Sequence, residues 1–331
     1  MRTHLIATKA DRHWQGIPGI ERAPNGRLWC VFFSGGTIEP HPENTVYLTT
    51  STDDGFTWAE PWPIVVPVAG WRAFDENLWI DPQGRMWLFY NRSMEGQGAY
   101  CEAIVADNPN DAELRWSAPR RIALGVPFAF RLNKPIVLLN GDWMLPVTYT
   151  RQTPPGYFGT DEHLQGVALS SDRGESWRLH GALEAPSWAL ENMELELRDG
   201  SVWMLIRTND GVLWQSRSTD GGHTWVAAHP SEIVNPGSRF FLRRLRSGKV
   251  LLINSSHPTN RQELTAYLSD GSDGAPFEHA LLLDSRDKVS YPDAVQAPDG
   301  TIYAVHDYDR YGPGEIVLNV FTEEEITTPV N

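Results

Sequence analysis

Six times along the chain, a turn that ends in glycine is followed by a short apolar run. The glycines stand at positions 26, 84, 141, 200, 248 and 300, and the runs after them include Arg27–Phe33 and Ser201–Ile206. Successive glycines are 48 to 59 residues apart, which leaves room for about four strands in each interval. No stretch sustains the 3.6-residue period of a helix. The pattern therefore predicts an all-β chain built from repeated, four-stranded antiparallel units.

One complete unit begins at Glu191. Alternating residues lead to the turn that ends at Gly200, and the chain returns to Arg207 as a hairpin. A third strand, Val212–Arg217, follows a second turn signal, and the unit closes with Ser218–Trp225.

This closing segment has the pattern Ser-x-Asp-x-Gly-x-Thr-Trp, which is known as an Asp box. Its aspartate can bond the local backbone, its glycine can take a positive φ, and its tryptophan can be buried between neighbouring units. We therefore expect a structural role for the aspartates of these motifs. Complete motifs occur at Ser51–Trp58, Ser170–Trp177 and Ser218–Trp225, and degenerate ones at Asp107–Trp116 and Ser269–Phe277.

Repeats of this length and strand content are typical of β-propeller blades. Six turns predict a six-bladed β-propeller with four-stranded antiparallel blades, in one domain that spans residues 1–331. The sixth unit has no complete Asp box, so we expect the N-terminal strand His4–Thr8 to complete its blade. A ring closed by strands from both ends of the chain removes the exposed edges that an open array of blades would leave.

Composition limits the partners and the chemistry. The net charge of -14 and the pI near 5.1 argue against nucleic acid and anionic membranes as partners, because both attract basic surfaces. Cys30 and Cys101 lie in apolar, strand-like stretches and are expected as buried thiols. No apolar run is long enough for a signal peptide or a membrane span, so we expect a cytoplasmic location. Metal-binding spacings and phosphate-binding glycine loops are missing from the sequence, so no metal or cofactor is expected.

Complete Asp boxes in register with six turns make the chain similar to the sialidase (neuraminidase) superfamily, a group of six-bladed propellers with BNR repeats. Glu191, nine residues before Gly200, matches the glutamate of the sialidase Asn-Glu-x-x-Val-x-Glu-Leu-x-Asp-Gly stretch, and Arg207 matches the arginine that ends the next strand. Tyr291, nine residues before Gly300, matches the tyrosine of the sialidase Tyr-Ser-x-Leu stretch. The resemblance implies a glycosidase that uses Tyr291 and Glu191.

One arginine of the sialidase pattern is absent from its expected place. Sialidases open their first blade with Arg-Ile-Pro, and that arginine joins two others in binding the substrate carboxylate. This chain has Gly16-Ile17-Pro18 there, and the acid that accompanies the arginine in sialidases is here the shorter Asp307. The departure leaves the identity of the sugar open.

Residues at the ends of the inner strands should share one pocket, because these strands begin and return near the mouth of the central channel. A tyrosine needs a neighbouring base to act as a nucleophile, and Glu191 can supply one for Tyr291. The alternative is that Tyr291 buries its ring in the last blade while Glu191 pairs with an arginine. Arg207 and Arg239, with Arg131 as a third candidate, can bind a carboxylate through bidentate hydrogen bonds.

Asp75, which starts the second blade, is the candidate for the general acid, and Asp293 and Asp307 compete with it for this role. An acid placed as in sialidases would come from a first-blade loop, which offers Glu39, His41 and Glu43. Further candidate substrate-binding residues at the blade ends are Asp293, Asp307, His257 and Arg310.

The sequence thus predicts an exo-type glycoside hydrolase whose partner is a small, acidic glycan. A polysaccharide lyase on the same scaffold is one alternative, in which Tyr291 or His257 would remove the proton α to a uronate carboxylate that arginine has neutralised. A carbohydrate-binding propeller without catalysis is the other, because one fold hosts several functions.

Overall fold

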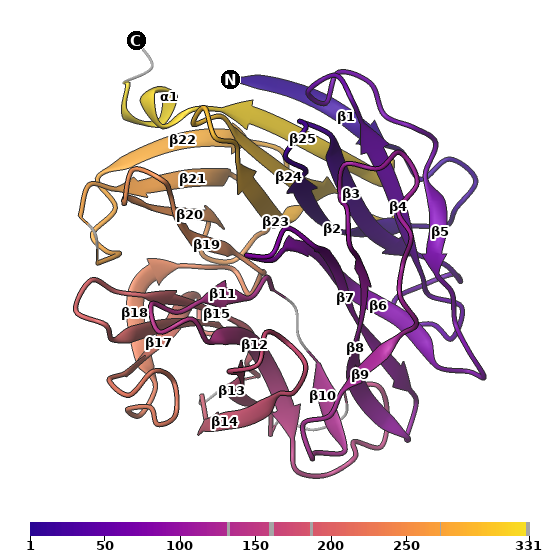
Figure 1. Ribbon diagram of the computed structural model, residues 1–331. Helices are drawn as coiled ribbons and strands as arrows, with labels where there is room; N and C mark the ends of the chain where they lie inside the picture. Colours follow the sequence, from indigo (N-terminus) through magenta and orange to yellow (C-terminus); the bar gives the residue numbers. More distant parts are fainter. Residues whose placement is uncertain (131–132, 159–161, 186–187, 272, 329–331) are drawn as a thin grey trace.

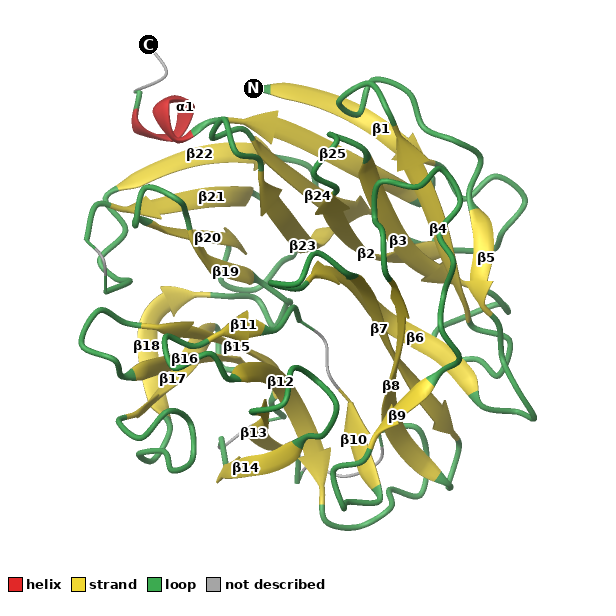
Figure 2. Ribbon diagram, in the orientation of Figure 1, coloured by secondary structure: helices red, strands yellow, loops and turns green. Residues whose placement is uncertain are grey.

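The computed structural model describes residues 1–130, 133–158, 162–185, 188–271 and 273–328. Its sheets stand side by side around a central axis (Figure 1). Strands and loops make up almost all of the described chain, with a short helix near its C-terminal end (Figure 2). The prediction of an all-β fold is confirmed.

Four of the sheets have four antiparallel strands each. The first contains β2 (Gln15–Arg22), β3 (Leu28–Ser34), β4 (Thr45–Ser51) and β5 (Trp62–Val65). The next contains β15 (Leu190–Glu196), β16 (Val202–Arg207), β17 (Val212–Ser218) and β18 (His229–Val234). It is followed by β19 (Phe241–Arg244), β20 (Val250–Ser255), β21 (Leu264–Ser269) and β22 (His279–Asp284). The last contains β23 (Val289–Gln296), β24 (Ile302–Tyr308), β25 (Glu315–Phe321) and β1 (Arg2–Ala7).

The remaining sheet has nine strands among the described residues and consists of two parts. The first part contains β6 (Arg72–Ile80), β7 (Met86–Met94), β8 (Gly98–Ala106) and β9 (Arg120–Ile122). The second contains β10 (Phe128–Phe130), β11 (Ile136–Val137), β12 (Trp143–Thr150), β13 (Leu164–Ser170) and β14 (Arg178–Leu183). A parallel pairing of Phe128 with Ala99 joins the parts. Division at this pairing gives six antiparallel groups, in agreement with a six-bladed propeller.

The last blade brings the two ends of the described chain together (Figure 1). β1 pairs with β25, and His4 lies opposite Leu318. The prediction that an N-terminal strand completes this blade is confirmed, although the strand begins two residues earlier than expected. After β25 the chain forms α1 (Glu323–Thr327), a five-residue helix that is too short to give a helical period in the sequence.

The complete Asp-box segments fold as tight turns that pack one blade against its neighbour. In Ser170–Trp177, the serine hydroxyl accepts a hydrogen bond from the backbone of Gly174 at 2.8 Å, and Asp172 accepts one from the backbone four residues later at 2.9 Å. A Cβ atom on Gly174 would lie 2.8 Å from ring atoms of both Trp87 and Trp143, which belong to the second and third blades. The aspartate therefore shapes the turn, and the glycine lets the turn approach the buried rings.

The hydrophobic core lies between neighbouring sheets, where tryptophan, phenylalanine and leucine side chains from adjacent blades meet. Cys30 and Cys101 are buried, free cysteines, so the prediction of buried thiols is confirmed. Within the described ranges, the structure contains no helix that is long and apolar enough to cross a membrane.

Four inner strands share a kink close to the central axis. Their pairing registers shift near their first residues, as in a β-bulge, in β2, β6, β15 and β23. At each shift one residue has a left-handed backbone: φ is 60° at Ile17, 47° at Asp75, 57° at Glu191 and 57° at Tyr291. A bulge redirects a side chain, and a left-handed conformation at residues other than glycine is costly and concentrates at functional sites. Three of these four residues are the catalytic candidates from the sequence.

Candidate active site

A single guanidinium group joins the two principal catalytic candidates. Arg207, at the end of β16, donates from Nη1 to Glu191 Oε2 and to the Tyr291 hydroxyl, at 2.8 Å each. Glu191 lies at the kink of β15 and Tyr291 at the kink of β23. All three side chains are buried. The structure therefore brings these residues of two blades into one hydrogen-bonded group.

Positive charge surrounds the Tyr291 ring. The guanidinium carbons of four arginines lie 4.1 to 5.8 Å from its centroid, namely Arg310, Arg239, Arg261 and Arg207. Such cations attract the π face of an aromatic ring, and they also favour a negative charge on the phenolic oxygen. A ligand carboxylate placed beside the ring would be within reach of several guanidinium groups.

Arg310 is held by acids from two blades. Its Nε donates to Asp307 Oδ2 at 2.7 Å, and its Nη1 donates to Glu39 Oε2 at 3.2 Å. Asp307 also accepts hydrogen bonds from the Ser290 hydroxyl at 2.6 Å and from the backbone N–H of Ile17 at 2.8 Å. The predicted binding residues Asp307 and Arg310 thus form one unit beside Tyr291.

Asp75 lies in the same electrostatic environment. Its burial raises its pKa, and the carboxylates of Glu39 and Glu191 raise it further, to about 8, against the opposing effect of Arg72 and Arg239. The side chain therefore holds a proton at neutral pH, as a general acid must. This environment is consistent with the role that the sequence suggested for Asp75.

The acidity of Tyr291 reflects opposing influences. Burial raises the pKa of its hydroxyl, and Glu191 adds to this effect, whereas Arg207, Arg261 and Arg310 lower it. The hydroxyl is therefore protonated in the resting protein and needs a base when it reacts. Glu191 is the carboxylate bound to the same Arg207 nitrogen as the phenolic oxygen.

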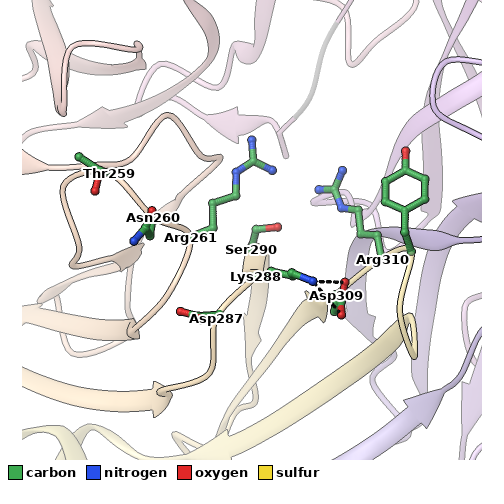
Figure 3. Close-up of a pocket in the computed structure, with 9 residues that line it drawn as sticks. Thr259, Asn260, Arg261, Asp287, Lys288, Ser290, Asp309 and Arg310 are labelled. Atoms are coloured by element: carbon green, nitrogen blue, oxygen red, sulfur yellow. Dashed lines mark hydrogen bonds and ion pairs between the residues drawn. The ribbon is translucent and has the colours of Figure 1, made fainter.

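A cavity of about 560 Å³ lies next to this group, between the loops that follow β20, β22 and β24. Its wall includes Arg261 and Arg310, which also face Tyr291. Figure 3 shows the two guanidinium groups pointing toward one another above Ser290 and Lys288. The rest of the lining is polar and consists of Thr259, Asn260, Asp287, Asp309 and Tyr311. A cavity of this size and polarity can receive a hydroxylated ligand.

Two predicted binding residues take part in other contacts. Asp293 Oδ2 lies 3.0 Å from Lys134 Nζ and accepts a hydrogen bond from the backbone of Ile20 at 2.7 Å, so it ties three blades together. His257 Nδ1 accepts hydrogen bonds from the backbone N–H groups of Thr259 and Asn260, which shapes the loop that carries Arg261. Arg131, the third arginine candidate, lies outside the described residues.

Sequence reasoning missed Arg261 and the ion pair between Glu39 and Arg310. Arg261 lies six residues beyond the end of β20, in a loop without any repeat pattern. Glu39 was only one of three candidate residues in the first-blade loop, with His41 and Glu43. Within the described part of the chain, no group of three His, Cys, Asp or Glu side chains could hold a metal ion.

Comparison with known proteins identifies the family of the chain and similar proteins. A family model described as a BNR repeat-like domain matches residues 26–304. A sialidase from Bacteroides fragilis (strain YCH46) is 24% identical over 318 residues, which cover 83% of this chain and 56% of that protein. The chain thus spans about half the length of this curated relative.

Solved structures show the same fold at low identity. The Hadza microbial sialidase Hz136 gives a TM-score of 0.80 at 18% identity, over 96% of this chain and 68% of that one. A protein of unknown function from Dyadobacter fermentans gives a TM-score of 0.76 at 18% identity, over 97% of both chains. The chain therefore belongs to the BNR repeat-like domain family, and its fold is the sialidase-like propeller that the sequence predicted.

Proposed function

We propose that this protein is an exo-type glycoside hydrolase that acts on a small, acidic glycan. The observation that carries the proposal is the group in which Arg207 bonds both Glu191 and the Tyr291 hydroxyl at 2.8 Å. A tyrosine nucleophile suits an anomeric carbon that bears a carboxylate, because an anionic Asp or Glu would be repelled. Sialidases are the recognised tyrosine exceptions among glycosidases.

In the first step, the Tyr291 oxygen attacks the anomeric carbon while Glu191 takes the phenolic proton. The bond from the anomeric carbon to the leaving oxygen breaks, and Asp75 gives its proton to that oxygen. In the second step, water attacks the same carbon and gives a proton to Asp75, and Glu191 returns its proton to Tyr291. Both carboxyl groups then have their starting protonation states, so the cycle is balanced.

The arginines position the substrate in this scheme. Arg207 and Arg239 bind its carboxylate, and the guanidinium charge also favours the partial phenolate that forms as Tyr291 reacts. Arg239 is buried and already donates to the backbone oxygen of Pro18 at 2.9 Å, which fixes its orientation.

The test is hydrolysis of a panel of aryl glycosides of sialic acid, uronic acids and neutral deoxy sugars. We expect release from an acidic sugar by the wild type and none by Tyr291→Phe, which lacks the nucleophilic oxygen but keeps the ring. The matched control is Tyr267→Phe, which changes a partly buried tyrosine in β21, the third strand of its blade. Turnover that survives in Tyr291→Phe would refute the nucleophile.

The same panel separates the alternatives. An unsaturated sugar product would identify a lyase, in which Tyr291 acts as a base. Binding of acidic sugars without turnover of any glycoside by the wild type would identify a carbohydrate-binding propeller.

A further inference from the structure

Gly16, at the start of the first blade, borders a space that a side chain from the last blade fills. A Cβ atom on Gly16 would lie 2.8 Å from Cδ and Nε of Arg310 and 2.8 Å from Oδ2 of Asp307. Atoms cannot approach so closely without displacement. The φ of Gly16 is not in the left-handed region. Glycine is therefore needed at position 16 because it has no side chain, and Arg310 fills the space that a side chain would take.

Two of the three guanidinium nitrogens of Arg310 are hydrogen-bonded, which fixes the side chain in this space. Asp307 and Glu39 accept from its Nε and Nη1. Its third nitrogen, Nη2, is buried and has no hydrogen-bond partner among the described residues. Nearly all buried polar groups in folded proteins are hydrogen-bonded, and a guanidinium donor that is not is costly. An acceptor from a ligand would satisfy it.

The position of Arg310 shows where that acceptor would be. Its guanidinium carbon lies 4.1 Å from the centroid of the Tyr291 ring, and its side chain also forms part of the wall of the 560 Å³ cavity. The guanidinium group of Arg261 approaches the Tyr291 ring and the cavity from the side opposite to Arg310 (Figure 3). An acceptor bound there would lie between the Tyr291 group and the cavity.

We infer that Arg310, seated in the space above Gly16, binds an anionic group of the ligand, and that the missing side chain at position 16 permits this. The ligand class is a sugar that carries a carboxylate, with its hydroxylated body extending into the cavity. The inference rests on the proposed function for the choice of an acidic sugar. It adds Arg310 to Arg207 and Arg239 as a third residue that recognises the acid, and it identifies Gly16 as the residue that makes room for it.

The experiment measures equilibrium binding by calorimetry. The probes are glucuronic acid, galacturonic acid and N-acetylneuraminic acid, each as the free acid and as its methyl ester. We expect the wild type to bind at least one acid more tightly than its ester. In Arg310→Ala and in Gly16→Ala, affinity for that acid should fall about 10- to 100-fold, as expected when a hydrogen bond to a charged group is lost. Affinity for the ester should change less.

Two further variants guard against indirect effects. Gly271→Ala is the matched glycine control, because a Cβ there would meet only an ordinary contact of 3.5 Å with Ser269; it should bind as the wild type does. The exchange of Gly16→Arg together with Arg310→Gly returns a guanidinium to the same space and should restore the preference for the acid, even if Gly16→Ala does not fold.

Wild-type binding without preference for any acid, or an unchanged preference in Arg310→Ala or Gly16→Ala, would overturn the inference. So would an exchange variant that folds but does not prefer the acid. Because binding is measured without turnover, a protein that prefers acids but hydrolyses nothing contradicts the proposed hydrolase and leaves this inference standing. A hydrolase that treats acid and ester alike contradicts this inference alone.

Discussion

The packing of the Asp-box turns can be tested with two glycines of nearly equal backbone conformation. Gly174 has a φ of +82° and Gly200 a φ of +80°. A Cβ atom on Gly174 would lie 2.8 Å from Trp87 and Trp143, whereas one on Gly200 would meet no atom within 4 Å. Both tryptophans are fully buried in a close-packed core, so they cannot move aside easily. The pair therefore separates backbone strain from loss of inter-blade packing.

We expect Gly200→Ala to lower the free energy of unfolding by about 1–2 kcal/mol, the cost of a left-handed backbone at an L-residue. Gly174→Ala should lose the same amount plus about 1–3 kcal/mol for overpacking against the rings. Urea unfolding followed by tryptophan fluorescence measures both values, with the wild type as reference. Equal losses in the two variants would refute the idea that the turn glycine is needed for contact between blades.

Three further predictions concern charge. Turnover by the wild type should fall as pH rises through about 8, where Asp75 loses its proton. The pH–rate profile of Asp75→Asn should lack this decrease on the alkaline side. An unchanged decrease in the variant would exclude Asp75 as the acid. Arg207→Ala should lower the free energy of unfolding by about 3–5 kcal/mol, because it leaves Glu191 buried and unpaired. In a double-mutant cycle measured by denaturation, adding Glu191→Ala should recover part of this loss. If the losses of the two single variants simply add, the ion pair between Arg207 and Glu191 does not stabilise the fold. The pKa of Asp172 is lowered from 3.8 to about 2. Its stabilising effect is therefore present above pH 3.8 and is lost as the pH falls toward 2. In thermal melts between these pH values, the melting temperature of Asp172→Asn should fall less with acid than that of the wild type.

The sequence was sufficient to predict the blades because each blade repeats the same order of turns and buried strands. A tight turn such as the one at Gly200 precedes an apolar strand that must be buried near the axis, so the pattern recurs. The resemblance to sialidases pointed to Tyr291, Glu191 and Arg207, and the propeller pattern agreed with it. Glu191 and Tyr291 stand near the start of a first strand and Arg207 at the end of a second, and in a propeller these positions face the same end of the channel.

The rest of the site depends on features that have no sequence period. Asp293 lies only two residues after Tyr291, yet the register shift between Ser290 and Asp293 separates their surroundings, and the aspartate pairs with Lys134. Arg261 lies in an irregular loop, where length and conformation decide the direction of the side chain. A missing side chain can be seen in a sequence, but the neighbour that fills its space cannot.

The left-handed residues of the inner strands also set a limit on engineering. Glu191 and Tyr291 each hold a backbone conformation that costs about 1–3 kcal/mol and that glycine would adopt freely. Glycine at either position would relieve this strain, but it would also remove the buried Tyr291 ring or leave Arg207 without its carboxylate partner, and each of these losses costs more than the strain. Relief of the strain by glycine would therefore yield a less stable protein, so the conformations of Glu191 and Tyr291 must be kept in any engineered version of this scaffold.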